Sequence, residues 1–315
     1  AEFVAAITPN QVSGQNITYA DRAGHIAMFY GGNTPVHARG DRAFWGGIVR
    51  GDSSSLLWTA LHSFADFPKT VDPPSGWVQN TNDPPWWATF PVVVKPGDYP
   101  SYIATRNMAL RPQRSVRMLA GDSSITWNEF VEYKNSTRME LADRVLENLL
   151  GVATTSSSET VQLAAGILGR WDRSADSGSR GAVLFTAWWG EYVRRMQGKS
   201  PYAAPWKADD PLNTPFGLSD ATVATAALEA VARVVAQTYG SADVAWGTVY
   251  RLRRDGLDYP ANGAGGEYGV FRVLGFTRDT DGKLAASGGT SYVAAIEFGT
   301  PVRAVSLIGY GNASR

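Results

Sequence analysis

The sequence has no cysteine among its 315 residues. This absence excludes a disulfide-stapled fold, a thiolate zinc site and a cysteine nucleophile, because each of them needs a thiol. An excess of charge is also missing, since 29 basic side chains balance 29 acidic ones. A dedicated nucleic-acid-binding protein presents a basic surface, so the balanced charge argues against that function.

Long apolar runs are absent too. A membrane-spanning helix needs about 18 or more consecutive apolar residues, and the sequence has no such run, so we expect no membrane span. With 44% hydrophobic and 18% charged residues, the composition is that of a folded globular protein rather than a disordered one. The length is sufficient for one large domain or two ordinary ones.

Familiar catalytic motifs are missing as well. Residues 51–55 lack the final glycine of a nucleophile elbow, and neither a Walker loop nor a zinc-binding His-Glu-x-x-His occurs. The glycines of residues 263–266 do not have dinucleotide-binding spacing and indicate a flexible loop. His25, His37 and His62 are not at metal-ligand spacing, and we interpret them as strand or surface residues.

Tryptophan is abundant, with 11 residues, several of them paired or beside prolines. Trp86-Trp87 and Trp188-Trp189 are two such pairs. Because aromatic side chains dominate buried area, we interpret them as core or pocket walls. A binding module whose tryptophans stack on sugars or other flat ligands is the alternative.

Hydrophobic spacing and turn signals predict a hairpin at 14–31, an irregular region at 32–100, then helices and finally strands. The expected helices cover 111–120, 126–133 (opened by a Thr126–Glu129 capping box), 139–150, 159–171, 182–196 and 220–239. The expected strands cover 269–274, 291–298 and 302–308, the last two forming a hairpin. Strands, helices and strands in this order favour an α+β fold. We expect three parts of one continuous, incomplete domain: 1–106, 107–260 and 261–315.

A dense polar segment at residues 76–87 carries the strongest candidate chemistry. Asn80 and Asn82 stand one residue apart, and on a strand they would share a face. Asparagines there can hold a loop by side-chain hydrogen bonds to the backbone. An asparagine amide aimed into a pocket can instead donate to a developing oxyanion. The residues alone leave both roles open.

Several blocks of the sequence resemble the penicillin acylase family of N-terminal-nucleophile hydrolases. The first are Tyr19-Ala20-Asp21, Gly24-His25-Ile26 and residues 76–85. Later blocks follow in the family's order at 109–119, 168–172, 176–179, 206–207, 211–215, 246–247, 266–269, 288–292 and 298–314. The likeness covers nearly the whole chain and is closest in character to the acyl-homoserine-lactone and aculeacin acylases.

The resemblance implies a fold and a reaction. The family folds as an αββα sandwich, so we expect an α+β chain that forms part of one, with a helical insert. Its members cut themselves into a small and a large subunit. The new N-terminal serine attacks the amide of an N-acyl compound, and its own α-amine serves as base. The resemblance therefore implies a substrate of the acyl-homoserine-lactone, penicillin or acyl-peptide type. It also implies a role in quorum quenching or in antibiotic chemistry.

The resemblance also assigns site residues. Asn82 corresponds to the asparagine that donates to the oxyanion, and Arg114 to the arginine that orients it; a surface salt bridge is the alternative for Arg114. Gly14, Gln15 and Asn16 correspond to residues that line the acyl pocket. Gly14 leaves room there and Gln15 is polar, so the preferred acyl chain stays open.

Partners and location are likewise expectations from the resemblance. The nucleophilic serine would lie outside these 315 residues, so a small subunit and the N-terminal part of the large subunit would be the partners. The substrate would be a small amphipathic N-acyl compound. We expect no cofactor, although the family allows a structural calcium whose ligands are unassigned, and a periplasmic or secreted location. A noncatalytic fragment is the alternative.

Overall fold

The computed structural model of the chain describes residues 1–11 and 14–309, and it separates into two compact units. The first unit comprises Ala1–Met108, Ser115–Ser123 and Phe298–Pro301, and the second comprises Ala109–Arg114, Ser124–Glu297 and the residues from Val302 onward. Both units mix helices with sheets, which agrees with the α+β prediction. The three-part division expected from the sequence stays a prediction.

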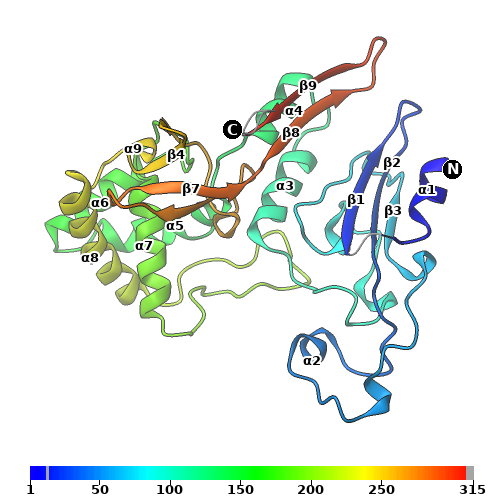
Figure 1. Ribbon diagram of the computed structural model, residues 1–315. Coiled ribbons are helices and arrows are strands. Elements are labelled where there is room, and N and C mark those ends of the chain that lie inside the picture. The colour runs from blue at the N-terminus through cyan, green and yellow to red at the C-terminus, as the bar shows by residue number, and fades with distance from the viewer. Residues whose placement is uncertain (12–13, 310–315) are drawn as a thin grey trace. The chain divides into compact units, whose positions relative to one another are not determined.

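A three-stranded antiparallel sheet organises the first unit (Figure 1). Its strands are β1 (Gln15–Ala20), β2 (Ile26–Gly31) and β3 (Lys69–Val71), in the order β1-β2-β3. The predicted hairpin is confirmed. The carboxylate of Asp21 holds its turn by accepting from the backbone N–H groups of Ala23 and His25 at 2.8 and 3.1 Å.

The rest of the first unit is irregular, as predicted, with short helical turns. These are α1 (Glu2–Ile7), which was not predicted, α2 (Arg42–Gly46), and 3₁₀ turns at Ser54–Leu56, Phe64–Asp66, Pro85–Trp87 and Pro96–Asp98. Trp86 and Trp87 are buried, and their indole N–H groups donate to Thr105 O and Asn107 O at 2.7 and 3.1 Å. These tryptophans are therefore core residues and do not form a stacking surface for sugars.

Helices dominate the second unit. They are α4 (Trp127–Lys134), α5 (Glu140–Ala153), α6 (Glu159–Gly169), α7 (Ala182–Arg195), α8 (Ala221–Tyr239) and the short α9 (Trp246–Val249), while α3 (Leu110–Ala120) begins in this unit and ends in the first. All the predicted helices are present, and α9 is additional. Helices α5 to α8 pack around one core (Figure 1), where Trp188 is fully buried and donates to Ala224 O at 3.0 Å. Among the described residues, no helix is both long and apolar enough to cross a bilayer.

The predicted capping box at the start of α4 is confirmed and supports a stability prediction. Thr126 Oγ1 accepts from Glu129 N at 3.4 Å, and the Glu129 carboxylate accepts from Thr126 N at 2.8 Å. We expect Thr126→Ala to lower the free energy of unfolding by about 1 kcal/mol, because the first turn loses its cap. Urea unfolding measures this loss. Glu132→Ala, on an exposed position of the same helix, is the control and should change stability by at most about 0.5 kcal/mol. Equal losses in both variants would contradict the capping role.

The strands of the second unit form two sheets. The larger sheet has the order β5-β4-β7-β6, with β4 (Tyr250–Arg254), β5 (Leu257–Pro260), β6 (Leu274–Arg278) and β7 (Leu284–Gly289). The smaller sheet pairs β8 (Tyr292–Glu297) with β9 (Arg303–Ile308) antiparallel, which confirms the predicted hairpin. Residues 310–314, the end of the last block that resembles the family, lie outside the described residues.

The strand predicted at 269–274 is wrong, because β6 begins only at Leu274. Gly269 has φ of 75°, and a Cβ there would lie 2.5 Å from the Cβ of Glu140. Val270 is fully buried in the helical core. The apolar run that suggested a strand therefore packs against helices instead of joining a ladder, and sequence alternation alone cannot separate these two outcomes.

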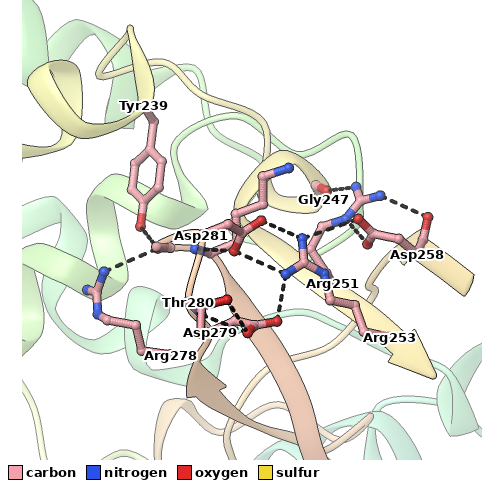
Figure 2. Close-up of polar contacts among 11 residues, drawn as sticks. Tyr239, Gly247, Arg251, Arg253, Asp258, Arg278, Asp279, Thr280 and Asp281 are labelled. Carbon is pink, nitrogen blue, oxygen red and sulfur yellow. Dashed lines mark hydrogen bonds and ion pairs between the residues drawn. The ribbon is translucent and has the colours of Figure 1, made fainter. Parts of the chain in front are cut away.

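An arginine-centred cluster connects strands β4 and β5 of the larger sheet to its β6–β7 turn (Figure 2). Arg253 of β4 contacts Asp258 of β5 at 3.2 Å, and it contacts Asp279 and Asp281 of the β6–β7 turn at 2.7 Å each. Hydrogen bonds from Arg253 lower the pKa of Asp281 to about 2. The pKa of Asp258 is also lowered, by hydrogen bonds from Arg251 and Arg253, and that of Asp279 by a hydrogen bond from Arg253.

This cluster predicts a pH-dependent stability. Carboxylates whose pKa is depressed by folding stabilise the fold above their unfolded pKa of about 3.9, and that contribution is lost as pH falls toward the folded values. We expect Arg253→Met to be less stable than the native chain at pH 7, with the difference shrinking between about pH 4 and pH 2. Urea midpoints across this range measure it. Arg170→Met, which removes an exposed charge from the same unit, is the control; a difference that stays constant with pH would contradict the prediction.

Candidate active site

A pocket of about 400 Å³ lies in the first unit, between the β1–β2 hairpin and the Asn80–Asn82 loop. Its walls are Gly14, Gln15, Asn16, Tyr30, Arg42, Asn80, Asn82, Asp83, Pro84, Ala104 and Thr105. The structure thus brings Asn82 together with the three predicted acyl-pocket residues. Tyr30, Arg42 and Thr105 were not predicted, because no local pattern marks residues that only the folded chain brings to one place.

The Asn80–Asn82 loop is not a strand, so the prediction that both side chains share a strand face is wrong. Asn82 has φ of 66°, in the left-handed region that asparagine tolerates. Asn80 Oδ1 accepts from Asn82 N at 2.9 Å, a side-chain bond to the backbone two residues on. This local bond replaces a strand ladder. Asn80 thus holds the loop, while Asn82 is exposed at the pocket.

The neighbours of Asn82 anchor the loop from inside. Thr81 and Asp83 are buried on either side of it. The Asp83 carboxylate accepts from Thr81 N at 2.6 Å and from Gln79 Nε2 at 3.1 Å. Burial raises the pKa of Asp83, and the hydrogen bonds from Thr81 and Gln79 oppose that rise. Asn82 is thus an exposed residue between two buried, hydrogen-bonded neighbours.

Strand β1 contacts the same loop through Asn16. Its Nδ2 donates to Asn80 Oδ1 at 3.1 Å and to Asp83 O at 3.3 Å. Tyr30 stands opposite Asn16 in the ladder, and its hydroxyl donates to Ile103 O at 2.9 Å. Burial raises the pKa of Tyr30, and the nearby Arg42 opposes that rise only in part.

Arg114 lies on α3 in the second unit, and its Nη2 donates to Ser136 Oγ at 3.5 Å. Asn82 belongs to the first unit. The role of Arg114 in orienting Asn82 therefore stays a prediction.

The histidines have ordinary partners. His25 Nδ1 lies 2.8 Å from the Asp72 carboxylate, and this hydrogen bond raises the pKa of His25. His62 Nε2 lies 2.9 Å from the Tyr102 hydroxyl. The His37 ring stacks on the Trp45 ring, with 3.8 Å between the ring centroids. Within residues 1–11 and 14–309, no three His, Cys, Asp or Glu side chains converge as metal ligands. Because calcium also takes backbone carbonyl and water oxygens, the structural calcium that the resemblance allows stays a prediction without assigned ligands.

Three comparisons relate the chain to known proteins. A family profile described as penicillin amidase matches residues 1–315. Aculeacin-A acylase of Actinoplanes utahensis is 27% identical over 252 residues, which is 71% of this chain and 30% of that protein. The acyl-homoserine lactone acylase PvdQ of Pseudomonas putida is 26% identical over 266 residues, covering 80% of this chain and 33% of that protein. The chain thus spans about a third of the length of these relatives.

A solved structure shares the fold. The thermostable penicillin G acylase from Alcaligenes faecalis matches with a TM-score of 0.50 and 19% identity, over 76% of this chain and 49% of that one. This likeness confirms the prediction of an α+β chain that forms part of an N-terminal-nucleophile hydrolase fold.

Proposed function

Because the chain belongs to the penicillin amidase family, we propose that it forms part of an acylase that hydrolyses the amide bond of N-acyl compounds. Its relatives carry acylase names, and such names describe hydrolysis of an acyl–nitrogen bond. Since the chain spans about a third of those relatives, the activity, the substrate and the partners of the whole protein are part of this proposal.

The Asn82 loop beside the pocket is the observation that carries the proposal. A serine attacks the amide carbon, and its proton passes to the α-amine of that serine. The carbonyl oxygen becomes an oxyanion, and the Asn82 side-chain amide donates to it. The carbon–nitrogen bond then breaks, the amine leaves with the proton, and water releases the acyl group as a carboxylic acid. A donor fixed before the reaction stabilises the oxyanion without a cost of reorganisation.

The serine, in this proposal, belongs to a segment outside these 315 residues. A small subunit and the N-terminal part of the large subunit would complete the site. Arg114 would orient the Asn82 amide, and Gly14, Gln15 and Asn16 would contact the acyl group. We propose that the protein acts in the periplasm or after secretion, where N-acyl-homoserine lactones, penicillins and acyl peptides are accessible.

A substrate panel tests the proposal. The protein is purified with its complementary chains and incubated with N-acyl-homoserine lactones of several lengths, an acyl peptide and penicillin G. We expect free carboxylic acid and free amine from at least one substrate, measured by mass spectrometry. Detection of homoserine lactone separates amide hydrolysis from opening of the lactone ring. If every N-acyl compound stays intact while the purified subunits remain folded, the chain is a noncatalytic scaffold instead.

A further inference from the structure

Three asparagines form a hydrogen-bonded chain along one wall of the pocket. Asn16 Nδ2 donates to Asn80 Oδ1 at 3.1 Å, and the same oxygen accepts from Asn82 N at 2.9 Å. Asn80 Nδ2 donates in turn to Asp83 O at 3.2 Å. The chain therefore runs from strand β1 to the backbone of the residue proposed to contact the oxyanion.

The amide of Asn16 has one orientation that its neighbours accept. Its Nδ2 faces two acceptors, Asn80 Oδ1 and Asp83 O, and the reversed amide would place an oxygen against both. Asn16 Oδ1 is buried and has no hydrogen-bond partner among the described residues. The hydrogen bonds from this amide to the loop are therefore made by its Nδ2 group.

The two ends of this hydrogen-bonded asparagine network, Asn16 and Asn82, differ in how they are held. Asn16 lies in a strand that is paired with β2 from Gln15 to Ala20, so its position is fixed by the sheet. Asn82 is exposed in a loop and has a positive φ, a conformation that asparagine tolerates and that is held here by the hydrogen bond from Asn82 N to Asn80 Oδ1. Buried Asp83 fixes the Thr81 side of the loop. Asn16 connects the Asn80 side to the sheet.

We propose that Asn16 is a positioning residue, which sets the direction of the Asn82 amide through Asn80. This inference rests on the proposed function, since it requires Asn82 to stabilise the oxyanion. For Asn16 this role takes the place of the acyl contact given above, and the two roles predict different kinetics. A positioning residue acts on the transition state and changes kcat, whereas a contact made equally to substrate and transition state changes KM.

The first test measures kcat and KM separately in the active acylase that contains this chain. Asn16→Ala removes the donor, and Asn16→Asp keeps the shape but presents oxygens to two acceptors. We expect kcat to fall about 10- to 100-fold in both variants, because small displacements of a catalytic group have effects of this size. KM is expected to stay within about twofold. Thr18→Ala, on an exposed position of the same strand, is the control and should leave both constants unchanged.

The second test is a double-mutant cycle. If Asn16 acts through Asn82, Asn16→Ala should reduce kcat less than about twofold once Asn82 is alanine, because effects of residues that act as a unit are not additive. Full additivity, or a change in KM alone, would overturn the positioning role. Should the Asn16 variants fail to fold, Asn80→Ala breaks the same chain from the loop side, with the same expected results.

The two proposals fail in different ways. If Asn82→Ala is impaired while Asn16→Ala and Asn80→Ala are not, only the positioning role of Asn16 is wrong. If Asn82→Ala retains full activity, the oxyanion role of Asn82 is wrong, and the positioning role fails with it.

Discussion

Asn82→Ala is expected to lower kcat of the active acylase by about 100- to 1,000-fold, with little change in KM. Loss of one side-chain donor to an oxyanion typically raises the barrier by about 2.7–4 kcal/mol. The donor contacts the charge that develops in the transition state, so the substrate should still bind. Steady-state kinetics on the best substrate of the panel measures the effect. Asn82→Asp should be impaired at least as strongly, because a carboxylate at this place would repel the oxyanion.

The structure offers a matched control for this substitution. Asn33 is also an exposed asparagine of the first unit and does not line the pocket. We expect Asn33→Ala to leave kcat and KM unchanged. An Asn82→Ala enzyme as active as Asn33→Ala would show that Asn82 has no oxyanion role. A selective rise in KM would place Asn82 in substrate binding instead.

Arg144→Met is expected to lower the free energy of unfolding of the second unit by about 3–5 kcal/mol. The substitution leaves the buried Glu140 carboxylate without the Arg144 countercharge. Arg144 and Glu140 are one turn apart on α5, buried, and joined at 2.8 Å. Arg144 also donates to Gln113 Oε1 at 2.7 Å and to Leu212 O. Methionine preserves much of the volume, so the loss reports mainly on the charge. Chemical denaturation measures it.

Two further variants isolate the effect of burial. Arg233 pairs with Glu229 at the same spacing on α8, but the Arg233 side chain is 60% exposed. Arg233→Met should therefore cost at most about 0.5 kcal/mol. The double variant Arg144→Met with Glu140→Leu should recover much of the lost stability, because an apolar pair of similar volume often replaces a buried ion pair without loss. Equal costs for Arg144→Met and Arg233→Met would contradict the argument.

The sequence by itself determined the six longer helices, both predicted hairpins and the family, but not the short helices α1, α2 and α9. Helix α4 follows from its Thr126–Glu129 capping box, and α5 follows from apolar residues repeated at helical spacing. These signals act between residues three or four apart, so they survive into the folded chain almost unchanged. The ordered blocks identified the penicillin amidase family, and the resemblance, rather than the Asn-x-Asn pattern alone, distinguishes Asn82 from Asn80.

Tertiary structure alone decided the rest. It turned the segment around Asn80 into a loop, and it placed Val270 in the helical core instead of a strand. It also brought Asn16 to Asn80, 64 positions away, and gathered Tyr30 and Arg42 at the same pocket. The physical reason is that these contacts join residues far apart in the sequence. Side-chain hydrogen bonds and burial between distant segments outweigh weak local preferences, and no local pattern encodes which distant partner a residue will meet.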